Sequence, residues 1–247
     1  MKLLAFETAT EACSVAVHVD GEVRERFEIA PRRHAELALP WAEQLLADAG
    51  LARSQLDAIA LSRGPGAFTG VRLAIALAQG IALALDRPLV PVSTLAVLAA
   101  QVPPPPVTAG EGGCDVGIPH PILAAIDARI GEIYTGTFVH RGDRLEATSG
   151  EAVIAPADYA LAGDDSGWIG VGTGFAAGDG ALATRLQARF ARVDAQALPH
   201  AADLARLAAA AFARGETVAP EHVEPAYLRN NVALTLAEQK ALRASRA

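Results

Sequence analysis

The sequence predicts an α/β protein made of two duplicated lobes, each a mixed sheet that opens with a β-meander and is flanked by helices. Short apolar runs of strand length alternate with longer runs of helical spacing. The opening pattern of the first half also returns in the second half, because Leu3-Leu4-Ala5-Phe6-Glu7 aligns with Leu123-Ala124-Ala125-Ile126-Asp127 at a constant offset. Each lobe therefore begins with a strand that ends in an acid.

The elements follow this duplication in order. In the first half we expect strands at 2–7, 12–19, 22–29, 56–62 and 89–92, and helices at 34–49, 69–86 and 93–101. In the second half we expect strands at 122–127, 132–139, 144–150 and 168–171, with helices near 180–190 and at 201–214. Turn residues join the second and third strands of each meander, Asp20-Gly21 in one and Arg141-Gly142-Asp143 in the other.

A Pro/Gly-rich segment, QVPPPPVTAGEGGCDVGIPHP, separates the two halves and has the composition of a linker. We therefore expect a first lobe at 1–101, a linker at 102–121, a second lobe at 122–224 and a C-terminal tail at 225–247. The tail places Arg229, Lys240, Arg243 and Arg246 against the single acid Glu238. Such a tail is either a solvated chain end or a contact to RNA phosphate.

Composition narrows the function classes. The formal net charge of -7 and the pI near 5.4 argue against a protein that coats nucleic acid by electrostatics alone. Cys13 and Cys114 form no metal-type or redox-type pair, which is typical of a reducing compartment, and we expect a cytoplasmic protein. The longest apolar stretch, Ala74 to Leu85, is too short for a bilayer, so we expect no membrane segment.

The most concentrated motif is SRGPGAFTGVR, from Ser62 to Arg72, between a buried strand and an apolar helix. Its glycines permit positive φ or close backbone approach, and Thr69 is placed to cap the helix. Because helix starts attract anions, the candidate anion-binding residues here are Arg63, Gly64, Gly66, Thr69 and Gly70. The loop lacks the Gly-Lys-Ser/Thr of a Walker motif and misses the dinucleotide spacing, so a tight strand-to-helix connection is the competing interpretation.

Two α/β lobes with an acid at the end of each first strand are the layout of the actin, sugar-kinase and heat-shock chaperone superfamily (actin-like, RNase H-like, ASKHA). There a nucleotide lies between the lobes and the acids orient a metal. Glu7 and Asp127 would take these roles, and Gly172 lies in a turn that resembles the adenosine side. The first hairpin has Ala9 where phosphate would need to approach a glycine, which argues against a nucleotide site. A nucleotide-hydrolysing enzyme is therefore the alternative interpretation and not the leading one.

Other catalytic signatures are missing from the sequence. The six histidines form neither a His-x-x-x-His pair nor a His-Glu-x-x-His motif, and no Gly-x-Ser-x-Gly elbow occurs. We therefore expect no metal site and no catalytic residues. The helix at 69–86 is apolar nearly all round with small residues at alternate positions, which is typical of a helix that packs in a core and also closely against a partner helix.

Five segments together resemble the bacterial TsaB (YeaZ) family. They are MKLLAFETATEACSVAV, RRHAELALP, LSRGPGAFTGVRLAIALAQGIALAL, AIDARIGEIYTG and VEPAYLRNN. The resemblance covers nearly the whole chain, and the glycine-rich segment is its most specific part. It implies the two-lobed actin-like fold.

The resemblance also implies a role as a non-catalytic scaffold in making the threonylcarbamoyl modification on N6 of adenosine 37 in tRNAs that read codons beginning with A. In this family's pathway the homologous TsaD carries the metal and the transfer chemistry, and TsaE is an associated ATPase. This chain has Ala38 where the second histidine of TsaD-like proteins would follow His34. The resemblance supports no peptidase activity, and it implies no cofactor beyond ATP or ADP with magnesium at an interface of the complex.

The resemblance implies four partners. A second copy of the chain would form a homodimer, and TsaD would replace that second copy in a heterodimer. TsaE would also bind, and tRNA would be contacted through the complex. The first-lobe helices would form the dimer and TsaD surface. We expect this surface to include His34, Glu36, Leu37, Trp41, Leu45, Phe68, Arg72, Leu73 and Leu77.

Overall fold

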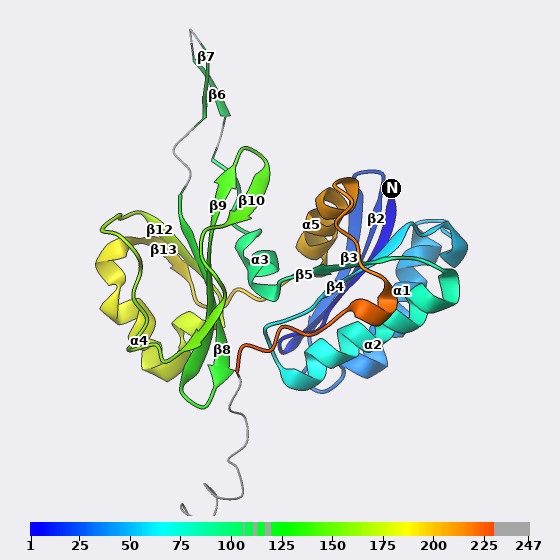
Figure 1. Cartoon of the computed structure of the whole chain (residues 1–247), viewed down its shortest axis with the longest axis horizontal. Coiled ribbons are helices and arrows are strands. Elements are labelled where there is room, and N and C mark those ends of the chain that lie inside the picture. Colours follow the sequence, from blue (N-terminus) through cyan, green and yellow to red (C-terminus); the bar gives the residue numbers. More distant parts are fainter. Residues whose placement is uncertain (106, 111–112, 117–119, 230–247) are drawn as a thin grey trace, which may run out of the picture.

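The computed structural model describes residues 1–105, 107–110, 113–116 and 120–229, and it contains two mixed sheets side by side (Figure 1). The first sheet contains β1 (Lys2–Glu7), β2 (Ala12–Val19), β3 (Glu22–Ile29), β4 (Ala58–Ser62) and β5 (Leu89–Val92). The second contains β8 (Ile122–Arg129), β9 (Glu132–Arg141), β10 (Arg144–Ala147), β11 (Ala152–Ile154), β12 (Trp168–Val171) and β13 (Phe190–Asp194). Their strand orders are β3-β2-β1-β4-β5 and β10-β9-β8-β12-β13.

The two sheets repeat one topology. In each, the first three strands form an antiparallel meander and the next two strands run parallel to the first. The predicted duplication and the two-lobed actin-like fold class are therefore confirmed. β1 and β4 are buried almost throughout because helices cover both faces of the first sheet.

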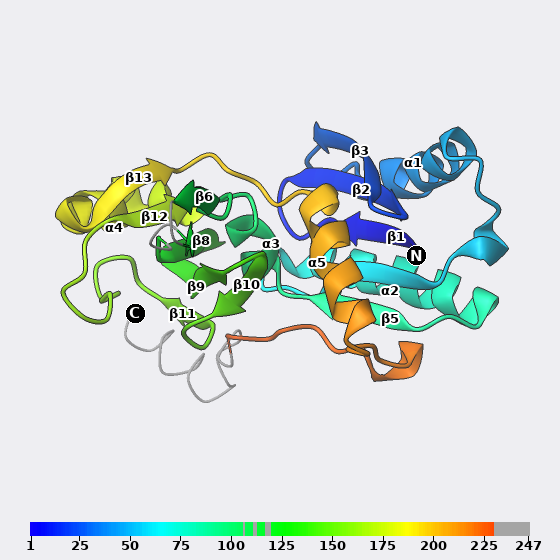
Figure 2. The same cartoon turned by 90° about the horizontal axis from the view of Figure 1, so that it is seen from above.

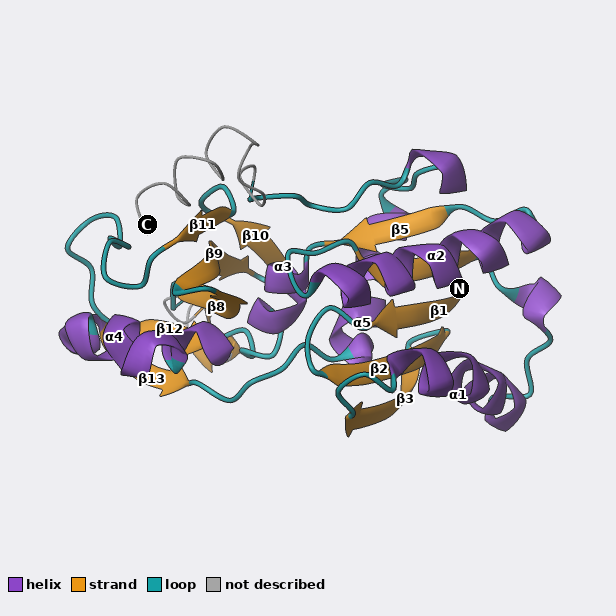
Figure 3. Ribbon diagram, turned by 90° about the horizontal axis from the view of Figure 1, so that it is seen from below, coloured by secondary structure: helices purple, strands orange, loops and turns teal. Residues whose placement is uncertain are grey.

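Helices cover the first sheet from both sides (Figures 2 and 3). On one face α1 (His34–Asp48) and α2 (Phe68–Leu85) pack against a core that includes Phe6, Val15 and Leu61. On the other face α5 (Ala201–Ala213) packs against Ala5 and neighbouring alanines of the sheet. Small residues on both α5 and the sheet allow this close approach.

Two helices each pack on the sheet of the other lobe, and not on the sheet that their position in the sequence predicts. We expected 93–101 in the first lobe, but α3 (Thr94–Ala99) packs Leu95 and Leu98 against the second sheet. We expected 201–214 in the second lobe, but α5 covers the first sheet. Apolar periodicity shows that a helix has a buried face, and it does not show which sheet covers that face. The predicted lobe boundaries as such stay a prediction.

The second lobe differs from expectation in two further places. The strand expected at 144–150 ends at Ala147, and a separate strand, β11, then pairs with β9. The helix expected near 180–190 is α4 (Ala177–Arg185), and β13 follows where the helix was to end. Gly178, Asp179 and Gly180 take left-handed angles at the start of α4, so this helix is interrupted.

The remaining short elements are connections. They are the 3-10 turns at Arg53–Gln55, Thr173–Phe175, Gln187–Arg189 and Pro220–His222, and the two-stranded hairpin of β6 (Val107–Gly110) and β7 (Gly113–Val116). The hairpin lies in the segment expected to be an irregular linker, and it projects away from both sheets in Figure 1.

The start of the C-terminal tail bridges the two lobes. The Ala226 N–H donates to the Arg63 carbonyl (2.8 Å) in the first lobe, and Arg229 bonds Glu132 and the Ala128 carbonyl in the second. We call residues 224–229 the strap. The predicted basic tail residues Lys240, Arg243 and Arg246, with Glu238, lie outside the described residues.

α2 is long and apolar enough to cross a membrane by length and composition, with a mean hydropathy of 1.7 over its 18 residues. The helix is longer than the apolar stretch Ala74 to Leu85, whose length was the reason to expect no membrane segment. A core helix of a globular protein passes the same test, and α2 packs along the first sheet. Only a third of this helix is buried, however, which is low for so apolar a sequence.

Candidate functional site

The glycine loop between β4 and α2 is packed directly against the turn that joins β1 and β2. A Cβ added to Gly66 would lie 2.4 Å from the Ala9 carbonyl oxygen, and one added to Gly70 would lie 1.9 Å from the Thr8 carbonyl oxygen. Gly64 takes a φ of +100°, which other residues rarely adopt. The prediction that the glycines of this loop permit positive φ or close backbone approach is confirmed.

Hydrogen bonds fix this contact at the start of α2. The Thr8 hydroxyl donates to the Gly70 carbonyl (2.7 Å), and the Ala67 N–H donates to the Ala9 carbonyl (2.7 Å). Ala67 is the residue before the helix, and no side chain caps it, so the predicted capping role of Thr69 is wrong. The chain's own hairpin therefore fills the place at this helix start where an anion would bind.

Glu7 lies beneath the same loop and is fully buried. Its carboxylate accepts hydrogen bonds from the Ala9 N–H (2.7 Å) and from the Ser62 hydroxyl. Burial raises the pKa of Glu7 to about 7, and the bonds from Ser62 and Ala9 oppose that rise. A carboxyl group that is closed off from solvent and bonded in this way is not presented to a metal or a nucleotide.

The acid of the second lobe is also occupied locally. Asp127 accepts a hydrogen bond from the Arg129 N–H (2.7 Å) and pairs with the Arg129 guanidinium at 3.2 Å. Gly172, in the turn after β12, has a φ of +110°, and a Cβ there would lie 2.2 Å from the Ala125 carbonyl. Both glycine-containing turns thus pack against protein backbone, and their residues do not fit the nucleotide and metal that the fold superfamily binds.

Among the described residues, no three His, Cys, Asp or Glu side chains lie together in a way that could hold a metal ion. Burial also raises the pKa of the Cys13 thiol to about 12, so it is no thiolate ligand or nucleophile near neutral pH.

The outer face of α1 and α2 carries apolar side chains in solvent. Phe68 and Leu83 of α2 are 66% and 64% exposed, and Leu39 of α1 is 44% exposed. Gly80 of α2 has open space around it. We call the set Leu39, Phe68, Gly80 and Leu83 the outer face, and its small and apolar residues suit close contact with another helix pair.

The predicted interface residues fall into three groups. Phe68, Arg72 and Glu36 are exposed. Leu37, Trp41, Leu73 and Leu77 are half-buried, and all of these except Leu73 pack against the first-lobe core. Leu45 is a buried core residue with 3% exposure, so it cannot contact a partner, and its inclusion was wrong.

His34 has a structural position at the start of α1. Its Nε2 atom lies 3.0 Å from the Thr10 carbonyl and 3.1 Å from the Ala12 carbonyl, so it links α1 to the turn after β1. Leu39 and Leu83 are exposed apolar residues of α1 and α2 that were not among the predicted interface residues. No sequence signal separates Leu83 from its neighbours, because α2 is apolar on all sides.

Arg72 connects Phe68 of the outer face to Tyr227 of the strap. The Arg72 guanidinium carbon lies 3.3 Å from the centre of the Phe68 ring and 5.3 Å from the centre of the Tyr227 ring. A guanidinium N–H of Arg72 also donates a hydrogen bond to the Tyr227 hydroxyl. Arg72 is thus held between two aromatic rings.

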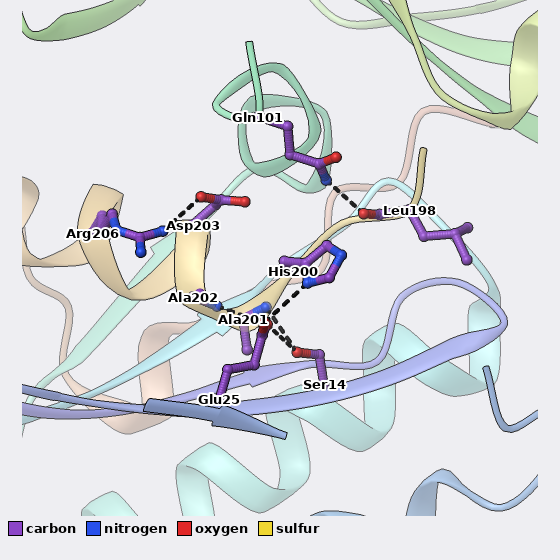
Figure 4. Close-up of polar contacts among 9 residues, drawn as sticks. All are labelled: Ser14, Glu25, Gln101, Leu198, His200, Ala201, Ala202, Asp203 and Arg206. Carbon is purple, nitrogen blue, oxygen red and sulfur yellow. Dashed lines mark hydrogen bonds and ion pairs between the residues drawn. The ribbon is translucent and has the colours of Figure 1, made fainter. Parts of the chain in front are cut away.

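A polar cluster holds the chain in place where it returns from the second lobe to α5 (Figure 4). Glu25 of β3 accepts hydrogen bonds from the Ser14 hydroxyl (2.6 Å), the Ala202 N–H (3.0 Å) and His200 Nδ1 (3.0 Å). These bonds hold the pKa of Glu25 below its usual value, although burial alone would raise it. The hydrogen bond to Glu25 in turn raises the pKa of His200.

The order of contacts in this cluster does not suit nucleophilic catalysis. Ser14 donates to Glu25, and its hydroxyl oxygen accepts from the Ala201 N–H (2.9 Å), while His200 lies on the other carboxylate oxygen of Glu25. A serine nucleophile needs a base within hydrogen-bond reach of its hydroxyl, with the acid behind that base. The cluster therefore anchors α5 to the first sheet.

Comparison with known proteins agrees with this geometry. The sequence model of the family described as "TsaD: tRNA N6-adenosine threonylcarbamoyltransferase" matches residues 27–236. A protein of Escherichia coli, "tRNA threonylcarbamoyladenosine biosynthesis protein TsaB", is 40% identical over 94% of this chain and 96% of its own. The chain belongs to the TsaB family. It also belongs to the wider TsaD-type family whose model it matches.

Other TsaB-like proteins support this placement. The Haemophilus influenzae protein of the same name is 33% identical over 94% of this chain and 95% of its own. Two solved Pseudomonas aeruginosa structures, one described as YeaZ and one as similar to the peptidase YEAZ, have TM-scores of 0.77 and 0.80 at 42% and 43% identity. Both cover 92% of this TsaB-family chain and 99% of their own.

Proposed function

We propose that this TsaB-family protein is a non-catalytic scaffold subunit for threonylcarbamoylation of adenosine 37 in tRNAs that read codons beginning with A. It forms a homodimer through the outer face of α1 and α2, and it exchanges this partner for TsaD, which carries out the transfer chemistry together with TsaE. The family membership of the chain supports the tRNA modification role.

One observation carries the scaffold role. α2 has a mean hydropathy of 1.7 over its 18 residues and two thirds of it is not buried, with Phe68 and Leu83 more than half exposed. Large apolar side chains exposed on neighbouring helices are typical of a contact with another protein. The gap at Gly80 lets a partner helix come close to the backbone of α2.

The alternative, an actin-like ATPase that uses Glu7 and Asp127, has less support. Glu7 is fully buried beneath the glycine loop, and Asp127 pairs with Arg129. The peptidase named in one structural relative also has no counterpart in the Ser14 cluster, where His200 does not reach the hydroxyl.

Replacing Leu83 with glutamate tests the outer face. We expect the dimer dissociation constant to rise at least about thirtyfold, because truncating or charging a central apolar anchor costs about 2 kcal/mol or more. Ile29→Glu is the matched control, since Ile29 is 60% exposed, is the last residue of strand β3 and is not one of the four outer-face residues. Sedimentation velocity over a concentration series measures both variants. Equal dissociation constants for Leu83→Glu and the wild type would contradict the proposed surface.

A further inference from the structure

A groove of about 810 Å³ lies between the two lobes, away from the glycine loop's contact with the first hairpin. One wall comes from the end of β5, α3 and α5, and the other from β9, β10 and the loop at 149–151. The strap closes a third side with residues 225–228. This volume and this place between two lobes are typical of a small-molecule site.

The walls combine apolar and polar surface. Leu207 and Ala211 of α5 face the groove from the first-lobe side, and Phe138 and Leu145 face it from the second lobe. An apolar ligand body could therefore be buried between the lobes. Polar and charged side chains also line the groove, and their own partners decide what kind of ligand fits.

Most charged groups of the groove already have partners. Arg214 forms a two-pronged pair with Glu216, with N···O distances of 2.6 and 2.7 Å. Glu151 accepts a hydrogen bond from the Ser93 hydroxyl across the lobes. Arg214 and Glu216 neutralise each other, whereas Glu151 keeps its negative charge and has one hydrogen bond, from Ser93.

Arg63 is different. Its hydrogen bonds with the described residues run through its backbone, because its N–H donates to the Val92 carbonyl (2.9 Å) and its carbonyl accepts from the Ala226 N–H (2.8 Å). These two bonds fix the residue between β5 and the strap, and Arg63 is half-buried and lines the groove. A planar guanidinium held in a partly closed space pairs best with a carboxylate or a phosphate.

We propose that this groove binds a small organic anion, whose carboxylate or phosphate group pairs with Arg63 and whose apolar part lies against Leu207 and Phe138. Because both lobes and the strap form the walls, the bound anion holds the lobes together. The α5 wall of the groove packs on the face of the first sheet opposite to α1 and α2, whereas Tyr227 of the strap, which also lines the groove, contacts Arg72 of α2.

Titration of the labelled full chain by NMR tests the site with three probes, benzoate, phenyl phosphate and the neutral benzamide. We expect one or both anions to shift the amide signals of Arg63, Ser93 and Ala226, and benzamide to leave them unchanged. Arg63→Gln should weaken anion binding at least tenfold. Arg206→Gln, an exposed α5 arginine paired with Asp203 outside the groove, is the matched control and should bind as the wild type does. The anion that binds more tightly identifies the ligand as a carboxylate or a phosphate.

A second variant guards against a fold defect in Arg63→Gln. Ala211→Trp fills the groove from the α5 wall while Arg63 stays in place, and it should abolish anion binding. The proposal is overturned if the anions shift no groove signals, if benzamide binds as well as the anions, or if Arg63→Gln and Ala211→Trp bind them as the wild type does.

Discussion

Replacing Gly70 with alanine is expected to lower the free energy of unfolding by about 3 kcal/mol, because the new methyl group would overlap the Thr8 carbonyl. The added Cβ would lie 1.9 Å from that oxygen, and backbone on both sides would have to move. The hydrogen bond from the Thr8 hydroxyl to the Gly70 carbonyl would be distorted as well. The intrinsic helix preference of alanine over glycine, about 1 kcal/mol, is too small to offset the clash.

Gly80→Ala in the same helix is the matched control. Nothing lies within 4 Å of a Cβ at this position, so the substitution should be neutral or stabilise the protein by up to about 1 kcal/mol. Thermal unfolding followed by circular dichroism separates the two, with a fall in Tm of roughly 6 to 12 °C expected for Gly70→Ala. A Gly70→Ala protein as stable as Gly80→Ala would show that the hairpin does not pack on the loop as described.

Replacing Glu7 with glutamine is expected to remove a pH-dependent loss of stability. Burial raises the pKa of Glu7 from 4.5 to about 7 in the folded state. A carboxyl with a raised folded pKa favours folding fully below its unfolded pKa, and this contribution is lost as pH rises through the folded value. Glu7 should therefore cost the wild type about 2.5 kcal/mol between about pH 5 and about pH 8.

Glutamine keeps the shape of Glu7 and its acceptor for the Ala9 N–H, and it carries no charge. Urea unfolding across this pH window should give a flatter stability curve for Glu7→Gln than for the wild type. Glu36→Gln is the control because that side chain is 71% exposed, and it should follow the wild-type curve. A Glu7→Gln curve parallel to the wild-type curve would contradict the assigned environment of this acid.

Much of the fold could be predicted because periodicity and turn residues are local. Strands β1, β2 and β3 have the predicted bounds, α1 ends one residue earlier than predicted, and α2 is shifted by one residue at both ends. The repeated acid after the first strand was enough to predict two lobes. The places of α3 and α5 could not be predicted, because the sheet that buries a helix is decided by contacts between residues far apart in the sequence.

The candidate site was predicted in part. Glycine spacing predicted close backbone approach, but it could not say whether a phosphate or another segment fills the space. The structure places Ala9 and Thr8 there. Arg63 was one of several candidate anion-binding residues on the loop, and the structure sets it apart because it faces the groove. Exposure, which distinguishes Leu83 from the buried Leu45, depends on the tertiary fold.

We propose that the outer face makes this chain a required scaffold for tRNA threonylcarbamoylation. The most direct test is the rate of threonylcarbamoyladenosine formation in a mixture of TsaD, TsaE, tRNA and this protein, measured with wild type, Leu83→Glu and Ile29→Glu. We predict no formation without the chain, equal rates with the wild type and Ile29→Glu, and at least a thirtyfold lower rate with folded Leu83→Glu at limiting concentration. Full modification without this chain, or an unchanged rate with Leu83→Glu, would contradict the account.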